Sequence, residues 1–572
     1  MNSLVLLLLS LAVLICGYIF YGRWLCKQWG VGEKDDPTPA HELEDGVDYV
    51  PAKAPVLLGH HFSSIAGAGP ITGPINAAIF GWVPVVLWIL IGGIFFGGVH
   101  DFGALFASLR HKGQSIGEII SANMSRRAKR LFLIFAYLTL ILVVAAFASI
   151  VASTFSATYV EGVLDKTASA ANASVAMVSL LFIVIAIVFG FLVYRRNAPM
   201  LISTVLGVVA IVVCMLIGMN FHPIYLSNST WMIVVGIYIA IASVTPVWIL
   251  LQPRDYLSSF LLYAMLAIAL VGVIVAHPSM DGMQAFAGFT VGNGNGTQYL
   301  FPVLFTTVAC GAISGFHSLV SSGTTSKQLD KEKDAKPIAY GGMLIECVLA
   351  ILTVCAINFA YKSGITTGAT AIFAGGISEM FASVGLPAAG VNIMRTLLIL
   401  TYSAFCLTSL DTATRLARFM FQEFWLEPGQ TVKDVKEGWK KVLVNPYVAT
   451  LITVVLGIAL GMTGYAKIWG LFGAANQLLA GLGLLAVAAW LGNIGRNNKM
   501  FLLPMAFMMV VTICSLCVTV KNQISQISAG GADWGPYAQA VLAILLIVLA
   551  VVLVIEGIQT LFGKKNKTKA AA

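Results

Sequence analysis

Charged residues are scarce in this chain. Aspartate, glutamate, lysine and arginine make up 10% of the 572 residues, whereas hydrophobic residues make up 58% and the mean hydropathy is +0.89. Soluble domains carry roughly a quarter charged residues. The scarcity of charge therefore excludes an ordinary soluble enzyme and indicates an all-α protein that crosses a membrane many times.

The chain also lacks the motifs of common enzymes and ATP-driven pumps. It contains no Gly-x-x-x-x-Gly-Lys-Ser/Thr loop, and the paired acids and Ser-His-Asp orders of soluble hydrolases are missing. We therefore expect neither an enzyme nor a bound cofactor. The nine cysteines fall almost entirely within apolar runs, and Cys514-x-x-Cys517 has no partner pair, so packing thiols are the favoured interpretation.

Apolar windows of about 20 residues, the length that spans a bilayer, predict fifteen membrane spans. They lie at 4–22, 56–80, 82–105, 131–153, 175–194, 199–220, 231–251, 258–277, 299–322, 338–361, 387–409, 447–464, 468–493, 500–520 and 536–558. The first run lacks a basic leader and a cleavage site, so we expect a retained helix. The weakly apolar segment 366–386 predicts a short external or re-entrant helix.

The basic residues predict the orientation of these spans. With the N-terminus outside, alternate loops hold 29 of the 34 lysines and arginines, which is the asymmetry of cytoplasmic loops. We therefore expect a cytoplasmic C-terminus, and the net charge of +9 needs no nucleic-acid partner. The basic tail 564–569 is expected to lie against anionic headgroups. The acidic stretch 31–49, with Asp35, Asp36 and Asp48, is expected to be a mobile cytoplasmic linker.

The segment Gly59–Pro74 carries an unusual composition for a membrane span. It holds four glycines, two prolines, two histidines and three hydroxyl residues within sixteen positions, between apolar runs. Broken backbone at membrane depth is tolerated only where it is buried in protein or lines a watery cavity. Secondary transporters build substrate and ion sites from such discontinuous helices. The segment therefore indicates transport.

A second interruption is predicted in the span 231–251, at Ser243-Val244-Thr245-Pro246. This span lies five spans after the first interrupted one and crosses in the opposite direction, which is the spacing of an inverted repeat. We expect one leading helix, a five-plus-five repeat and four trailing helices, the plan of the leucine-transporter-like superfamily. The expected divisions are 1–54, 55–225, 226–415, 416–446 (a cytoplasmic connector) and 447–572.

The expected substrate site lies between these two interruptions. Unpaired backbone N–H groups at the start of a half-helix attract carboxylates. The predicted substrate-binding residues are His60, His61, Ser63, Ser64, Gly67 and Gly69, with Ser243 and Thr245 opposite.

A hydroxyl-rich end of the span 299–322 suggests a coupling-ion site. In sodium-coupled members of that superfamily, hydroxyls at such a place join carbonyls of the first broken helix. The ion candidates are Ala66, Ser318, Ser321 and Ser322, with His317 as a proton carrier. The alternative is that small residues merely let the helices pack closely.

The intramembrane histidines allow three interpretations. His60, His61 and His317 could carry a proton or contact substrate, could bind a transition metal together, or could hold the broken backbone through hydrogen bonds. Charges at membrane depth are costly and are functional candidates. Gating positions are expected at His100, Asp101, Arg254, Asp255 and Asp411, although Asp411 could instead cap a helix.

Two further charges lie inside spans, Glu346 and Arg395. An arginine at this depth could hold a substrate carboxylate through paired hydrogen bonds. We favour the alternative that Arg395 snorkels or pairs with a carboxylate such as Glu346.

Several blocks together resemble the carbon starvation protein A family of bacterial inner-membrane transporters. They are GHHFSSIAGAGPITGP (59–74), GGVHDF (97–102), LQPRDYLSSF (251–260), GAISGFHSLVSSGTTSKQL (311–329), YGGMLIE (340–346), LTSLDTATRLARF (407–419) and WGLFGAANQLLA (469–480). The resemblance implies uptake of peptides or pyruvate across the cytoplasmic membrane, driven by a proton or sodium gradient. The alternatives are a nutrient-sensing membrane protein and an intramembrane metal-binding protein. The oligomeric state stays open.

Overall fold

The computed structural model describes residues 1–33, 37–46, 49–196, 198–246, 249–293, 296–427, 430, 432–530 and 534–562. The acidic residues Asp35, Asp36 and Asp48 of the expected linker and the basic tail 564–569 lie outside these residues, as does the C-terminus.

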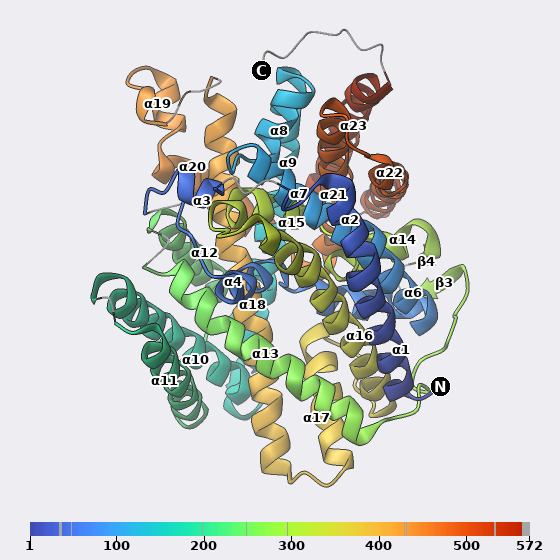
Figure 1. Cartoon of the computed structure of the whole chain (residues 1–572). Helices are drawn as coiled ribbons and strands as arrows, with labels where there is room; N and C mark the ends of the chain where they lie inside the picture. Colours follow the sequence, from blue (N-terminus) through green and yellow to red (C-terminus); the bar gives the residue numbers. More distant parts are fainter. Residues whose placement is uncertain are drawn as a thin grey trace.

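The described chain is almost entirely helical (Figure 1). The helices up to the middle of the chain are α1 (Ser3–Cys16), α2 (Gly22–Trp29), α3 (Pro39–Glu42), α4 (Ala54–Ile65), α5 (Gly69–Ala77), α6 (Trp82–Gly92), α7 (Gly98–Arg110), α8 (Ile116–Asn123), α9 (Arg126–Phe155), α10 (Lys166–Gly190), α11 (Met200–Asn220), α12 (Asn228–Val244) and α13 (Leu251–Ala276). Those that follow are α14 (Leu300–Thr307), α15 (Gly315–Gly323), α16 (Gly341–Lys362), α17 (Ala369–Ser383), α18 (Ala388–Trp425), α19 (Trp439–Leu443), α20 (Pro446–Gly461), α21 (Tyr465–Asn493), α22 (Lys499–Ser528) and α23 (Trp534–Phe562).

The strands of the described residues form two short antiparallel hairpins. β1 (Thr158–Val160) pairs with β2 (Val163–Asp165), and Thr158 lies opposite Asp165. β3 (Thr290–Asn293) pairs with β4 (Gly296–Tyr299), and Thr290 lies opposite Tyr299. Both hairpins connect helices, and Val291 of β3 packs against the edge of the core.

Eleven helices of the described residues are long and apolar enough to cross a membrane. The two shorter apolar helices α12 and α20, and the two interrupted segments α4–α5 and α14–α15, occupy the remaining predicted spans. The prediction of an all-α multi-pass membrane protein is confirmed. Helix α17 lies within the segment 366–386, for which a short additional helix was expected.

Several helices begin where a polar side chain caps the first backbone N–H groups. Ser125 accepts a hydrogen bond from the Ala128 N–H at the start of α9, and Ser227 accepts one from the Thr230 N–H at the start of α12. Asp165 accepts bonds from two N–H groups at the start of α10. Such caps supply partners for donors that have none within the helix. They fix where the long spans begin.

The first helix interruption lies where the sequence predicts it. Helix α4 ends at Ile65 and α5 begins at Gly69. Residues 66–68 connect the two helices and are not helical themselves. Gly67 lies too close to its surroundings for a larger residue, because an added Cβ would be 2.8 Å from the Ser409 hydroxyl oxygen. Gly67 therefore allows close packing against α18 in addition to lying in the break.

The second interruption is a correction to the sequence interpretation. Helix α12 ends at Val244 and a separate helix, α13, begins at Leu251, so Ser243 and Thr245 mark the end of a helix. Pro246 has no N–H and disfavours helical geometry at the preceding residue, which explains the ending. The second interrupted helix of the described residues is instead α14–α15, with its break at 308–314. Ala309 there has a φ of +45°.

The two interrupted helices pack against each other in the centre of the molecule. Helix α5 contacts α14 and the turn 309–311, and α4 contacts α15. Helices α9 and α18 pack against each other, and α13 and α21 cover the interrupted pair on either side. In Figure 1, α3, α8 and α19 gather at the upper end of the view, whereas α17 lies toward the opposite end. The core thus surrounds two broken helices.

Candidate functional site

Glycines let the two interrupted helices approach at their breaks. A Cβ added to Gly73 would lie 2.2 Å from the Val308 carbonyl oxygen, and one added to Gly69 would lie 2.3 Å from the Cys310 Cβ. These separations are shorter than carbon atoms tolerate, so the glycines set the distance between α5 and the second break. The predicted positions Gly67 and Gly69 therefore act through close packing of backbone.

Helix α18 contributes hydroxyl groups to the first break. The Ser409 hydroxyl donates to the Ser64 carbonyl oxygen at 3.2 Å, and the Thr72 and Tyr402 hydroxyls are 2.7 Å apart. All four residues are buried. The Ser64 carbonyl of the broken helix is therefore paired with α18, the eleventh predicted span, and the predicted serines of the span 299–322 do not reach it.

Those serines bond within their own helix. The Ser318 hydroxyl donates to the Gly315 carbonyl at 2.8 Å, and the Ser322 hydroxyl donates to the Ser318 carbonyl at 2.7 Å. The hydroxyls of Ser321 and Ser63 are buried without a hydrogen-bond partner among the described residues. The structure does not bring Ala66 together with Ser318 and Ser322 through any hydrogen bond that it describes.

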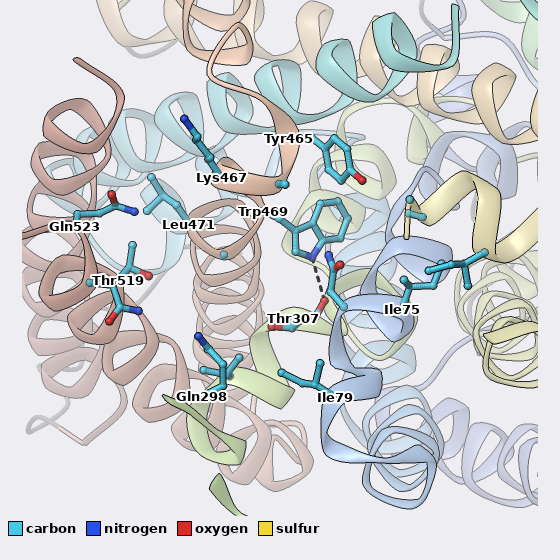
Figure 2. Close-up of a pocket in the computed structure, with 18 of the residues that line it drawn as sticks. Ile75, Ile79, Gln298, Thr307, Tyr465, Lys467, Trp469, Leu471, Thr519 and Gln523 are labelled. Carbon is cyan, nitrogen blue, oxygen red and sulfur yellow. Dashed lines mark hydrogen bonds between the residues drawn. The ribbon is translucent and has the colours of Figure 1, made fainter. Parts of the chain in front are cut away.

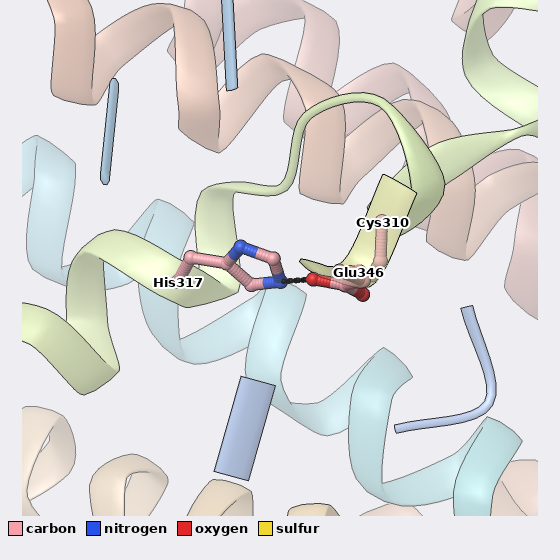
Figure 3. Close-up of side chains that lie close together, drawn as sticks. All are labelled: Cys310, His317 and Glu346. Carbon is pink, nitrogen blue, oxygen red and sulfur yellow. Dashed lines mark ion pairs between the residues drawn. The ribbon is translucent and has the colours of Figure 1, made fainter. Parts of the chain in front are cut away.

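Asp101 is the centre of a buried charged cluster. One of its carboxylate oxygens is 2.7 Å from His100 Nδ1, and the other is 2.8 Å from His317 Nδ1. His317 Nε2 lies 3.4 Å from a carboxylate oxygen of Glu346 (Figure 3). These four side chains have no exposed surface. The cluster joins α7, α15 and α16, so the predicted gating residues His100 and Asp101 lie in the core of the molecule.

Cys310 completes this group. Its thiol and the nearest ligand atoms of His317 and Glu346 all lie within 4.8 Å of one another. The residue sits in the second break, where it donates to the Ser314 hydroxyl at 3.3 Å. The Asn476 amide on α21 bonds to the same hydroxyl at 3.0 Å, and its oxygen accepts the Phe316 N–H at 2.9 Å. The second break is therefore fixed by polar contacts.

A second charged cluster is built around Arg254 on α13. Its guanidinium pairs with the Asp411 carboxylate and the Tyr238 hydroxyl, and donates to the Thr408 hydroxyl at 2.9 Å. The Tyr238 hydroxyl also donates to Asp411 at 2.9 Å. This contact places Asp411 within α18 as an ion-pair partner, so the alternative of a helix cap is not observed. Three predicted gating residues thus meet, because Asp255 also lies 3.7 Å from Arg254.

His60 faces this second cluster. Its Nδ1 lies 3.5 Å from Asp255, and neither ring nitrogen has a hydrogen-bond partner among the described residues. His61 points elsewhere, with its Nδ1 2.8 Å from the Thr325 hydroxyl. The predicted metal set of His60, His61 and His317 is therefore not brought together. The two adjacent histidines contact different neighbours: His60 faces Asp255 on α13, and His61 contacts Thr325.

Ser243 and Thr245 lie away from the interrupted pair. The Ser243 hydroxyl is 3.2 Å from the Thr450 hydroxyl, and its carbonyl accepts a bond from Arg418 at 2.6 Å. Arg415 donates to the carbonyls of Ala242 and Thr245. Cationic donors at the last carbonyls of a helix satisfy groups that lack helical partners. These residues close the end of α12 and do not face the first break.

Arg395 pairs with Glu379 on α17, at 2.7 Å, and not with Glu346. Its side chain is 38% exposed, so this is a surface ion pair. Arg395 therefore pairs with a carboxylate, as expected, but that carboxylate is Glu379 of the short helix α17. The tertiary fold brings these two residues together.

A cavity of about 580 Å³ reaches toward the interrupted helices from one end of the molecule. Figure 2 shows Ile75 of α5 and Ile79, in the turn just after α5, facing it from one side, and Lys467 and Trp469 of α21 from another. The Trp469 indole donates to the Thr307 carbonyl at 3.3 Å, beside the second break. The rest of the lining comes from α14, α16, α17, α21, α22 and their connections, mostly near the ends of the helices.

The other side of the broken helix borders a much smaller cavity. A cavity of only about 40 Å³ borders His60 and Ser64, with Lys327 and Arg415 from loops expected in the cytoplasm. The described conformation thus offers far more space on one side of the breaks than on the other.

Sequence reasoning missed Cys310, Asn476, Ser409 and Tyr238. Each belongs to an apolar or small-residue run that looks like ordinary packing. The break at 308–314 carried a signal, since Cys310-Gly311 and Ser314-Gly315 interrupt an apolar span. The other partners become recognisable only when helices far apart in the chain are side by side.

Comparison with known proteins supports a family assignment. The family model described as carbon starvation protein CstA matches residues 2–366 and 359–515. The peptide transporter CstA of Bacillus subtilis (strain 168) is 31% identical over 577 residues, covering 93% of each chain. The pyruvate/proton symporter BtsT of Escherichia coli (strain K12) is 29% identical, covering 90% of this chain and 81% of that protein.

A solved structure, the Eremococcus coleocola manganese transporter with a bis-isothiourea compound, shares 12% identity. It covers 91% of this chain and 99% of its own, with a TM-score of 0.47. The sequence matches extend over nearly all of the chain and over the blocks that form both interrupted helices. This chain therefore belongs to the carbon starvation protein CstA family.

Proposed function

We propose that this protein is a secondary active transporter of the bacterial cytoplasmic membrane that imports small carboxylate nutrients, peptides or pyruvate, with protons. The observation that carries the proposal is the contact of two interrupted helices at their breaks, inside the protein. Discontinuous helices at membrane depth form substrate sites in transporters. The names of the relatives, a peptide transporter and a pyruvate/proton symporter, agree with it.

The proposed architecture is an inverted repeat with different divisions from those the sequence suggested. One half contains α4–α5, α6–α7, α9, α12 and α13, and the other contains α14–α15, α16, α18, α20 and α21. The packing supports this division: α13 covers α4 and α18, as α21 covers α15 and α9. Helices α12 and α20 contact each other, and each contacts both α9 and α18. Helices α10 and α11 would then be an insertion in the first half.

We place the substrate between the two breaks, against residues 66–69 and 308–314. The start of α5 presents backbone N–H groups that favour a carboxylate. Lys467 lines the larger cavity and would raise the local concentration of anions on the way in. His61, Ser63 and Ser64 belong to the same broken helix. The difference between about 580 Å³ and about 40 Å³ suits a conformation that loads substrate from outside.

His60 and Asp255 are the proposed proton-coupling pair. They face each other at 3.5 Å on α4 and α13, and His60 borders the small inner cavity. Arg254, Asp411, Arg415 and Lys327 are the charged groups around them. Movement of α4 relative to α13 would change both their separation and their access to water. A proton shared by His60 and Asp255 would thus couple the movement of the broken helix α4 to its contact with α13.

The test uses purified protein in liposomes with labelled pyruvate and a labelled dipeptide. We expect accumulation above equilibrium of at least one of them under an inward proton gradient, and none under a sodium gradient alone. His60→Asn should retain counterflow exchange but lose accumulation, whereas Glu379→Gln, at a surface pair, should behave as the parent. Absence of uptake of both compounds under every gradient would refute the cargo. Accumulation driven only by sodium would refute proton coupling.

A further inference from the structure

The buried group Cys310, His317 and Glu346 is not needed for the proposed proton step, and its chemistry is unusual for a membrane core. The three residues come from the second break, from α15 and from α16. Cys310 is 3% exposed and the other two are fully buried. Their ligand atoms lie within 4.8 Å of one another (Figure 3). A thiol, an imidazole and a carboxylate therefore converge on one point.

Asp101 decides which nitrogen of His317 faces that point. Its carboxylate oxygen is 2.8 Å from His317 Nδ1, so this nitrogen carries the proton and donates it. In the neutral ring, Nε2 then holds the lone pair on the side of the Glu346 carboxylate, whereas a proton on Nε2 gives the His317–Glu346 ion pair. Histidines that bind metals commonly donate their other ring N–H to a carboxylate in this way. The arrangement prepares Nε2 as a ligand.

The acceptor atoms at this point lack partners. His317 Nε2 and both carboxylate oxygens of Glu346 are buried without a hydrogen-bond partner among the described residues. The 3.4 Å between Nε2 and the nearest oxygen exceeds the roughly 2.7–2.9 Å of a charge-assisted N–H···O bond. A lone pair facing a carboxylate in the core is unfavourable unless a cation lies between them. A proton between His317 and Glu346 supplies that charge when no metal is bound, and a metal ion can supply it by replacing the proton.

We propose that Cys310, His317 and Glu346 bind a divalent transition metal ion, with zinc the best fit. Sulfur, nitrogen and oxygen donors together match an ion of intermediate softness, and three protein ligands leave a fourth position open. The thiol loses its proton on binding, and the resulting thiolate can accept from the Asn476 amide, now 3.8 Å from the sulfur. Calcium and magnesium, which prefer oxygen alone, do not suit the set.

The ion would tie three parts of the chain together. Cys310 lies in the second break, His317 one helix segment later, and Glu346 on the neighbouring span. The Gly69 backbone packs directly on Cys310, so the same ion would support the contact between the two interrupted helices. Asp101 acts as a positioning residue through His317. The inference does not depend on which solute is transported.

The experiment measures metal on the intact, detergent-purified protein. After treatment with a chelator, the protein is titrated with zinc, and bound zinc per chain is determined by elemental analysis. Loading with cobalt(II) in place of zinc should give a thiolate-to-cobalt charge-transfer band in the near ultraviolet. We expect one ion per chain. Cys310→Ser should abolish the band and weaken zinc binding at least about tenfold, and Asp101→Asn should weaken it by about 10–100-fold.

Matched controls separate ligand loss from damage to the fold. Cys347→Ser changes a buried cysteine next to Glu346, whose sulfur faces Gly93 instead, and should keep the band and the affinity. Glu346→Gln provides a second ligand variant if Cys310→Ser does not fold. Monodispersity and helical circular dichroism verify each protein. Failure of the parent to retain zinc or to show the cobalt band would overturn the site, as would unchanged affinity in Cys310→Ser or Glu346→Gln.

Discussion

At the residue scale, the chain buries some ion pairs completely and leaves others partly exposed at the surface. Asp411 illustrates the first case. Its carboxylate is 1% exposed and pairs with Arg254 and the Tyr238 hydroxyl. Glu379, paired with Arg395, illustrates the second, with 33% of its side chain exposed. The two pairs use the same chemistry at different depths, so their contributions to stability should differ.

Asp411→Asn should destabilise the protein much more than Glu379→Gln. Loss of the carboxylate removes the closest anionic partner of the buried Arg254 and leaves only Asp255, at 3.7 Å; breaking a buried pair costs about 3–5 kcal/mol. Loss of an exposed pair costs about 0–1 kcal/mol. Thermal unfolding in detergent, followed by tryptophan fluorescence, compares the two variants with the parent. Equal melting temperatures of the two variants would contradict the importance assigned to the Arg254 cluster.

His111, just beyond the end of α7, gives a pH prediction. Burial lowers the pKa of His111 below its ordinary 6.5, and the neutral ring can accept from the Asn123 amide at 3.2 Å. Below about pH 6.5 the unfolded chain therefore binds more protons at His111 than the folded chain does. The free energy of unfolding should be highest above this pH and should decrease as the pH falls below it. His111→Gln should lose less thermal stability than the parent over the same acidification. An identical loss in both proteins would refute this role.

At the scale of elements, glycine positions control how closely the interrupted helices pack. The contrast is between Gly73, whose added Cβ would meet the Val308 carbonyl oxygen at 2.2 Å, and Gly470 on α21, whose added Cβ would meet nothing within 4 Å. The first position lies at a contact between broken helices, whereas the second lies beside the larger cavity.

Gly73→Ala should lower thermal stability, and Gly470→Ala should not. Overpacking in a filled interior typically costs about 1–3 kcal/mol. Alanine in a helix is favoured over glycine by about 0.8–1 kcal/mol, so Gly470→Ala is expected to be neutral or stabilising. Melting temperatures of both variants in the same detergent are the measurement. A stable Gly73→Ala protein would mean that α5 and the second break can separate at little cost.

The elements also show what kind of information the sequence carried. The first break was predictable because glycine and proline disfavour helix locally, whatever surrounds them. The same rule identified Pro246, but it could not say whether the chain would resume the same helix or end it. The break at 308–314 has no proline, and the predicted span 299–322 ran through it without interruption. Contacts of this segment with α5 and α21 stabilise the break in the folded structure.

At the scale of the whole molecule, the distribution of basic residues sets the expected orientation. The loops that hold α8 and α19 gather at one end of the molecule, away from α17 (Figure 1). These loops carry many of the lysines and arginines. Positively charged loops remain in the cytoplasm. The larger cavity would then open to the outside.

Single added cysteines test this orientation. Ser363→Cys, after α16, and Lys436→Cys, in the connector before α19, both occupy exposed positions. In intact cells, a membrane-impermeant maleimide should label Ser363→Cys, and should label Lys436→Cys only after permeabilisation. The parent, with its nine native cysteines, sets the background. The reverse labelling pattern would invert the proposed topology and the direction in which the larger cavity faces.

Membrane embedding, the positions of the spans and the first broken helix could all be predicted from the amino-acid sequence. Hydropathy, charge placement and the glycine–proline composition act locally, so they can be read along the chain. The tertiary structure decided the partners: His317 with Asp101 and Glu346, and Asp411 with Arg254. These residues are far apart in sequence, and similar apolar helices offer many possible neighbours. Only close packing of particular helix faces selects which buried charges meet.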